Sequence, residues 1–306
     1  MSTILVTGKD GQVGFELLRS LAGVGQIFAT GRNEMDLSDP DSIRRMVRQV
    51  RPGLIVNAAA YTAVDRAESE PELAMAVNGN APGFLAEEAK RLGAALIHYS
   101  TDYVFDGTGS EPYAEDDEPR PINVYGRTKL AGERAIKEVD VPHLILRSGW
   151  IYGVRGKNFL LTMLRLARER DELSVVEDQV GAPTWSRAIA DATGGILTRL
   201  GCGQPGFVEA CAGQRGVYHL SAAGQTSWHG FAAAIFSHAV SQQCSQSAWE
   251  LDRTPTLKPI SSEQYPTPAR RPRYSVLANA KLQRTFGVLM PDWKVSLAQC
   301  MGGAKD

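Results

Sequence analysis

Residues 3–24, TILVTGKDGQVGFELLRSLAGV, join a short apolar run to an amphipathic pattern through a turn rich in glycine. Apolar and β-branched residues dominate TILVT, which predicts a buried strand. The segment that follows predicts a helix, because one of its faces gathers Val13, Leu17, Leu18 and Leu21. A strand, a glycine-rich turn and a helix in this order are typical of the first unit of a dinucleotide-binding sheet.

The turn carries Gly8, Gly11 and Gly14 in a G-x-x-G-x-x-G pattern. Glycines permit a tight turn and close backbone approach, and the helix N-terminus offers unpaired N–H groups to a pyrophosphate. An ordinary turn is the alternative, since a glycine triplet alone is weak support for a cofactor site. Its position between a strand and a helix favours the cofactor.

Short β-branched runs recur after this unit, at residues 26–30, 53–60, 95–100 and 143–153, and helical patterns separate them. This alternation predicts βαβ units around a parallel sheet. We therefore predict an α/β fold with a Rossmann-type, doubly wound parallel sheet.

The alternation weakens after Gly153, where turn-rich stretches separate the remaining helical patterns. The segment SSEQYPTPARRPRYS, residues 261–275, holds several prolines and so excludes a long helix or a central strand. We predict that residues 1–150 form the NAD(P)-binding domain, joined by later returning segments. Residues 151–306 are expected to form a smaller, loop-rich α/β lobe over the strand ends, where ligands bind in such sheets.

The bulk composition excludes several classes of function. The 306 residues carry a formal net charge of −1, so no global basic field attracts nucleic acid or an anionic membrane. The first apolar run is too short for a signal peptide or a membrane span. The chain's histidines and its four cysteines (Cys202, Cys211, Cys244 and Cys300) show no metal-ligand spacing. We expect no metal site, reduced thiols and a cytoplasmic protein.

The end of the second predicted strand bears on the choice of cofactor. NAD-binding domains usually place an acidic residue there to bond the ribose 2′-hydroxyl, whereas ATGRN places Arg32 at this position. A guanidinium pairs with a 2′-phosphate, which favours NADPH and leaves NADH as an alternative. Arg32 could instead be merely solvated. Asp36 and Leu37 are candidates to flank the adenine.

Tyr125 and Lys129 are spaced i, i+4 in a predicted helix and so share one of its faces. Tyrosine ordinarily titrates near pH 10, and a nearby ammonium favours the phenolate, so Lys129 is expected to lower the pKa of Tyr125. By itself the pair most often marks a solvated face. The preceding segment HYSTDYVFDG favours a catalytic pair over a solvated face, because it places Thr101 and Asp102 at the carboxyl end of the fourth strand. A hydroxyl there can bond a substrate carbonyl oxygen beside the tyrosine.

With these motifs in order, the chain resembles the extended short-chain dehydrogenase/reductase family and, within it, the dTDP-4-dehydrorhamnose reductases. The Tyr/Lys pair is generic to the wider family, and other segments are more specific. The resemblance covers nearly the whole chain and is carried by GQVG, VNAAAYTAVDRAESEPELA, HYSTDYVFDG, VYGRTKLAGE, RSGWIYG, DQVGAPT, YHLSAAGQTSWHGFA and YPTPARRP.

The resemblance implies the last step of dTDP-rhamnose biosynthesis, in which NADPH reduces the C4 keto group of dTDP-4-dehydro-L-rhamnose. Tyr125 would donate the proton, Thr101 would bond the carbonyl oxygen, and Lys129 would hold the nicotinamide ribose. The C-terminal lobe would bind the nucleotide sugar. Residues implied to border the cofactor are Gly11, Gln12, Val13, Ala60, Tyr61, Thr62 and Tyr99. Those implied to contact the substrate are Thr101, Asp102, Trp150, Gln179 and Arg271, with Arg273 as a second candidate phosphate partner.

One departure from the family concerns magnesium, which in some members is thought to bridge a dimer through acidic side chains. The first such position matches Glu16, but the other two are Arg187 and Lys294. Cations cannot replace carboxylates around a hard divalent ion, so we expect a monomer rather than a metal-bridged dimer.

Two rival functions remain open. Another nucleotide-sugar 4-ketoreductase or epimerase would use the same scaffold, because function resides in the site rather than in the fold. A non-catalytic NADP-binding regulatory subunit would be expected to lose Tyr125, Lys129 or Thr101, all of which are present. Trp228 starts an amphipathic segment and is expected to pack rather than to contact substrate.

Overall fold

The computed structural model describes residues 3–241, 249 and 251–302. Its centre is a six-stranded sheet of order β10-β5-β4-β3-β1-β2, and every neighbouring pair is parallel. The strands are β1 (Thr3–Thr7), β2 (Gln26–Thr30), β3 (Leu54–Asn57), β4 (Ala95–Thr101), β5 (His143–Ser148) and β10 (Gly216–His219). The predicted Rossmann-type parallel sheet is therefore confirmed.

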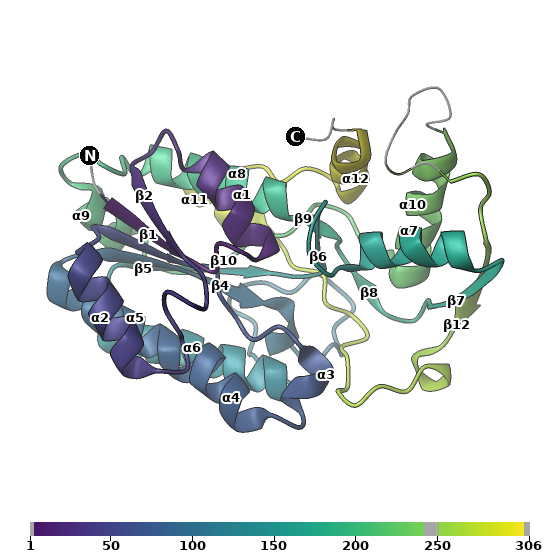
Figure 1. The fold of residues 1–306 in the computed structure, drawn as a ribbon, viewed down its shortest axis with the longest axis horizontal. Coiled ribbons are helices and arrows are strands. Elements are labelled where there is room, and N and C mark those ends of the chain that lie inside the picture. The colour runs from purple at the N-terminus through teal and green to yellow at the C-terminus, as the bar shows by residue number, and fades with distance from the viewer. Residues whose placement is uncertain (1–2, 242–248, 250, 303–306) are drawn as a thin grey trace.

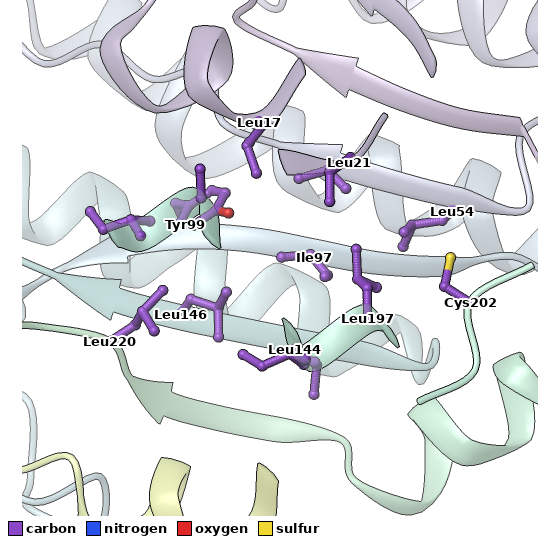
Figure 2. Close-up of a cluster of buried hydrophobic side chains, with 14 of the residues drawn as sticks. Leu17, Leu21, Leu54, Ile97, Tyr99, Leu144, Leu146, Leu197, Cys202 and Leu220 are labelled. Carbon is purple, nitrogen blue, oxygen red and sulfur yellow. The ribbon is translucent and has the colours of Figure 1, made fainter. Parts of the chain in front are cut away.

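Helices cover both faces of this sheet, as Figure 1 shows. One layer contains α1 (Gln12–Ser20), α8 (Ser186–Arg199), α9 (Phe207–Gly213) and α11 (Ala280–Phe286), and the opposite layer contains α2 (Pro40–Val50), α5 (Ala81–Leu92) and α6 (Val124–Val139). Strands β3, β4 and β5 are buried along their full length, as expected for a sheet covered on both sides. Figure 2 shows one of the resulting cores, in which Leu17 of α1, Leu21 just after α1 and Leu197 of α8 meet residues of β4 and β5.

The loop after β3 borders the strand ends and is supported by a helical segment. Helices α3 (Val64–Ala67) and α4 (Pro71–Met75) lead into a π-helical turn, η1 (Ala76–Asn80), which continues into α5. Asn78 in this turn is buried; its side chain accepts from the Tyr61 N–H at 2.8 Å and donates to the Tyr61 carbonyl at 3.0 Å. Such π-turns are frequent at functional sites, and here one holds the loop that follows β3.

A second lobe lies beside the carboxyl ends of the strands and has a separate hydrophobic core. It contains α7 (Phe159–Glu169), α10 (Trp228–Ser241), α12 (Trp293–Gly302) and the parallel pair β7 (Glu172–Val176) and β12 (Thr256–Ile260). Its shorter elements are β6 (Ile151–Tyr152), β8 (Val180–Gly181), β9 (Thr184–Trp185), β11 (Thr226–Ser227) and the 3₁₀ turn η3 (Ser262–Gln264), whereas the 3₁₀ turn η2 (Asp102–Val104) directly follows β4 of the main sheet.

The chain passes between the lobes more than once. After the first visit to the second lobe, α8, α9 and β10 return to the main sheet, and α11 does so again near the end. The division at residue 150, with later segments returning to the first domain, remains a proposal.

Among the described residues, no helix is long and apolar enough to cross a membrane. Cys202, Cys211 and Cys300 are buried free thiols. Cys244 lies outside the described residues.

Candidate active site

The glycine-rich turn places backbone where side chains would not fit. Gly8 has a φ of 72°, and a Cβ on it would lie 2.8 Å from the Ala59 backbone at the end of β3. A Cβ on Gly14 would lie 2.0 Å from the Gly8 carbonyl oxygen, so this glycine allows α1 to pack onto the turn. Gly11 is the N-cap of α1, and no side chain makes a capping hydrogen bond there. The arrangement is a cradle for a pyrophosphate.

A cavity of about 740 Å³ extends from this cradle to the ends of β4 and β5. The predicted residues that line it are Gly8, Gly11, Gln12, Val13, Arg32, Asp36, Leu37, Ala60, Tyr61, Thr62, Tyr99, Thr101, Asp102, Tyr125, Lys129 and Trp150. Four residues predicted to bind cofactor or substrate do not line it: Gly14, Gln179, Arg271 and Arg273. Gly14 lies outside the lining because it faces the Gly8 carbonyl, where α1 packs onto the turn, and its cofactor role stays a prediction.

Both positively and negatively charged side chains lie at the end of the cavity beside β2, where the adenosine is expected. Arg32 is exposed at the end of β2, next to Gly31. Glu34 accepts a 2.8 Å hydrogen bond from the Gly31 N–H and pairs with Lys9. Asp36 accepts from the backbone and hydroxyl of Ser38, and these bonds hold the pKa of Asp36 below its ordinary value. Since Lys9 is neutralised by Glu34, Arg32 is the cation best placed for an anionic group here.

Tyr125 is the second residue of α6, and two features bring it to the end of β4. Asn123 caps the helix by accepting from the Gly126 N–H at 2.7 Å. Gly126 itself lies against η2, because a Cβ there would be only 2.1 Å from the Tyr103 carbonyl oxygen. Burial raises the pKa of Tyr125 to about 12; a hydrogen bond with Thr101 partly opposes this rise, and the Asp102 charge adds to it. The expected lowering of this pKa by Lys129 is therefore wrong for the protein without ligand.

Lys129 is directed at β4 instead. Its Nζ donates to the Tyr99 carbonyl at 2.6 Å and lies 3.2 Å from His98 Nε2. Burial lowers the pKa of Lys129 to about 8, against the raising effect of Glu133. An ammonium has three donors, so two contacts with β4 leave one for a ligand. His98 also contacts Asn57, its Nδ1 lying 3.0 Å from Asn57 Nδ2, and was not predicted as part of the site.

Thr101 and Asp102 end β4 and start η2. The Thr101 hydroxyl accepts from the Tyr103 N–H at 3.1 Å and donates to Asp102 Oδ1 at 3.0 Å. Asp102 is 2% exposed, and burial raises the pKa of its carboxyl to about 6. A Cβ on Gly149 would lie 2.4 Å from the Asp102 carboxyl carbon, so glycine is needed there to admit the carboxyl group.

Two tryptophans form the wall towards the second lobe. Trp150 has a φ of 51°, in the left-handed region, and its ring stacks on Trp228 with centroids 3.5 Å apart and 1° between the planes. Trp228 also lines the cavity while it packs against Trp150, and its expected packing role stays a prediction. Gln179 lies behind the pair and accepts from Trp228 Nε1 at 3.2 Å, which makes it a support for the wall.

The Arg271 side chain is hydrogen-bonded to other residues of the protein. Its guanidinium donates to Asp65 Oδ2 at 2.7 Å and to the carbonyl of Ala269 at 2.9 Å. Arg273 is exposed and lies 3.8 Å from Glu263. Arg271 thus pairs with Asp65 and does not line the cavity, and its phosphate role stays a prediction.

Glu16, the candidate magnesium ligand, is 2% exposed and pairs with Arg187 at 3.0 Å between Oε2 and Nε. Arg19 Nε lies 3.6 Å from the same oxygen. Within the described part of the chain, no group of three or more acidic, histidine or cysteine side chains gathers as a metal site would require. A guanidinium thus faces Glu16 where a second carboxylate would be needed.

Comparison with known proteins agrees with this geometry. The family model of the RmlD substrate binding domain matches residues 1–305. The dTDP-4-dehydrorhamnose reductase of Burkholderia thailandensis is 50% identical over 300 residues, 97% of each chain, and that of Escherichia coli K12 is 44% identical over 97% of this chain and 96% of its own.

A solved dTDP-4-dehydrorhamnose reductase from Bacillus anthracis, in complex with NADP, superposes with a TM-score of 0.86 at 34% identity over 98% of each chain. The resemblance predicted from the motifs is confirmed. This chain therefore belongs to the family of the RmlD substrate binding domain, and its relatives in Burkholderia thailandensis and Escherichia coli K12 are dTDP-4-dehydrorhamnose reductases.

Proposed function

We propose that this protein reduces the C4 keto group of dTDP-4-dehydro-L-rhamnose, with NADPH as hydride donor, and so completes dTDP-L-rhamnose. The observation that carries the proposal is the meeting of Tyr125, Thr101 and Lys129 on one cavity with the glycine-rich turn. The names of the relatives, with identities of 44–50% over nearly the whole chain, support this substrate.

The cavity fits a dinucleotide. The start of α1, where no side chain makes a capping hydrogen bond, and the close approach of Gly8 to Ala59 suit a pyrophosphate. Arg32 suits a 2′-phosphate. Lys129 has a donor left for a ribose hydroxyl. The NADP in the Bacillus anthracis structure supports the same cofactor class. When bound, NADPH supplies the hydride.

Tyr125 acts in this proposal as an acid. With a pKa near 12 it holds its proton at neutral pH, so the proton is present when the carbonyl oxygen becomes basic. Thr101 bonds the same oxygen and stabilises the charge that develops there. The Trp150–Trp228 pair borders the substrate, and we assign it the exclusion of water and the positioning of the sugar.

The test is oxidation of NADPH by the purified protein with freshly prepared dTDP-4-dehydro-L-rhamnose, repeated with NADH. We expect oxidation that requires the sugar, and we expect Tyr125→Phe to lose most turnover while it still binds NADPH. Wild-type protein that binds NADPH but oxidises none with this sugar contradicts the proposal and favours another keto sugar or a regulatory role. Tyr125→Phe with full turnover contradicts the proton-donor assignment alone.

We further propose that the protein works as a monomer without a magnesium bridge. The pairing of buried Glu16 with Arg187 supports this, since the carboxylate is already neutralised. Light scattering with and without a chelator, at concentrations above and below the assay, tests the proposal. A dimer that dissociates on chelation contradicts it.

A further inference from the structure

Asn123 is a buried asparagine whose side chain joins two distant parts of the chain. Its Oδ1 accepts from the Gly126 N–H at 2.7 Å and so caps α6, two residues before Tyr125. Its Nδ2 donates to the Arg270 carbonyl at 2.8 Å. A backbone N–H only donates and a carbonyl only accepts, so these bonds together need a side chain with both an acceptor and a donor. Aspartate would cap the helix as well but has no donor for the carbonyl.

Arg270 belongs to residues 269–273, which we name the crossing segment because the chain passes there from the second lobe back to the main sheet. Asp65 of α3 accepts from the Ala269 N–H at 3.2 Å and from Arg271 Nη2 at 2.7 Å, and Figure 1 shows the chain running past this helix. Asp65 is therefore a second anchor of the crossing segment on the side of the main sheet.

A glycine brings the crossing segment close to the chain that leads from η2 to α6. Gly107 has a φ of 81°, and a Cβ on it would lie 2.5 Å from Pro272 Cα. Both the left-handed backbone and this close approach favour glycine. Together with Asn123 and Asp65, the contact fixes the crossing segment beside the helix that carries Tyr125.

The other end of the crossing segment reaches the tryptophan wall. The Arg273 carbonyl accepts from the Val180 N–H of β8 at 2.7 Å. The next residue of β8, Gly181, lies against Trp150, because a Cβ on it would be only 2.3 Å from Trp150 Cε2. β8 also pairs with β11, which ends directly before Trp228. The crossing segment thus connects the start of α6 to the strand that supports the wall.

We propose that the crossing segment sets the gap between Tyr125 and the Trp150–Trp228 wall, and that Asn123 is the positioning residue that anchors it to α6. The inference rests on the proposed function, in which the keto oxygen lies at Tyr125 while the sugar is positioned by the wall. Both groups border one cavity, so their separation decides how the sugar is aligned. A misplacement of about 1 Å costs about 100-fold in a well-oriented reaction.

Asn123→Asp tests the anchor, because the carboxylate still accepts from the Gly126 N–H but cannot donate to Arg270. We expect kcat/KM for the keto sugar to fall about tenfold, the worth of one hydrogen bond. The Kd for NADPH should stay at the wild-type value, because the cap of α6 is kept. Asn123→Ser repeats the test without an added charge, since its hydroxyl caps the helix but lies one bond closer to the main chain than the amide nitrogen. We expect the same loss.

Amide hydrogen exchange, followed by mass spectrometry of peptides that contain Val180, gives a readout that needs no catalysis. Asn123→Asp should speed exchange of the Val180 N–H, because the segment that carries its acceptor, the Arg273 carbonyl, is loosened. Asp65→Ala releases the crossing segment at its second anchor without any change on α6. We expect this variant to show the same faster exchange and a lower kcat/KM for the sugar.

Asn279→Asp is the matched control. Asn279 makes the same two kinds of bond, since its Oδ1 accepts from the Ser221 N–H at 3.2 Å and its Nδ2 donates to the Ser221 carbonyl at 2.7 Å. Neither residue lines the cavity or belongs to the crossing segment. The variant loses one donor in the same way, so the free energy of unfolding should fall as in Asn123→Asp. Its kcat/KM for the sugar and its exchange at Val180 should match the wild type.

The outcomes separate this inference from the proposed function. If wild-type protein reduces the sugar and Asn123→Asp keeps the wild-type kcat/KM, the positioning role is overturned and the reductase stands. The role is also overturned if kcat/KM falls while exchange at Val180 is unchanged, or if Asp65→Ala behaves as wild type, because the effect is then confined to α6. If wild-type protein does not reduce the sugar, the proposed function and the positioning role both fall, and faster exchange at Val180 then shows only a mechanical link.

Discussion

Gly126 decides how closely the helix that carries Tyr125 approaches the end of β4. A Cβ at this position would lie 2.1 Å from the Tyr103 carbonyl oxygen, whereas such contacts are essentially never closer than 3.0 Å. The contacted atom is backbone and cannot rotate away, so Gly126→Ala must move α6 or η2 by about 1 Å. A misplacement of this size costs about 100-fold in a well-oriented reaction.

We therefore expect Gly126→Ala to lower kcat about 100-fold. Overpacking of this kind also destabilises a protein by about 1–3 kcal/mol, so the free energy of unfolding is measured in urea alongside kcat and the KM for each substrate. The KM for NADPH should change less than kcat, because the glycine-rich turn lies on another element and, of the proposed cofactor contacts, α6 carries only those of Tyr125 and Lys129.

Gly195→Ala is the matched control. Gly195 is exposed in α8, and a Cβ there meets no atom within 4 Å. Alanine favours a helix over glycine by about 1 kcal/mol, so this variant should be slightly more stable and fully active. A Gly126→Ala protein that is folded and keeps wild-type kcat would refute the claim that this contact positions Tyr125.

Three further predictions concern charge. Arg32→Ala should raise the KM for NADPH about fivefold and leave the KM for NADH unchanged, since an exposed pairing is worth up to about 1 kcal/mol. Equal increases in both KM values would show that Arg32 does not bind the 2′-phosphate. Glu133→Gln should destabilise the protein by about 3–5 kcal/mol in urea unfolding, because it leaves buried Arg147 without its 2.7 Å partner. The pKa of Asp102 rises from 3.8 to about 6 on folding, so the native state binds this proton more tightly and stability falls as pH rises between these values. Asp102→Asn should therefore be more stable than wild type by up to about 3 kcal/mol at pH 7, with the difference gone below about pH 4 in pH-dependent unfolding.

The sequence motifs predicted most of the residues that line the cavity, because each motif is a local pattern. A glycine-rich turn, a polar strand end and an i, i+4 pair are set by neighbouring residues, and parallel strands bring their carboxyl ends to one edge. That reasoning placed Thr101 and Tyr125 on the same cavity without knowledge of the packing. The fold class followed from the same alternation of strands and helices.

Contacts between distant segments could not be predicted in this way. Trp228 reaches Trp150 across 78 residues, and Arg271 finds Asp65 across 206, so neither partner is visible in local spacing. Lys129 shows a subtler limit. The spacing correctly put it on the face of Tyr125, but that face also meets β4, and the Tyr99 carbonyl holds the ammonium there.

One face of α6 explains how the site keeps its geometry. Tyr125, Lys129 and Glu133 recur every four residues and so form one stripe directed at the sheet. Glu133 lies about 12 Å along the helix from Tyr125 and binds Arg147 of β5 through two hydrogen bonds of 2.9 and 2.7 Å, while Ser100 of β4 donates to it at 2.6 Å. Sliding α6 by one residue would turn this stripe by about 100° and leave both buried charges unpaired, at a cost of several kcal/mol. The ion pair therefore fixes the register of the helix, and the register places the Tyr125 hydroxyl beside Thr101.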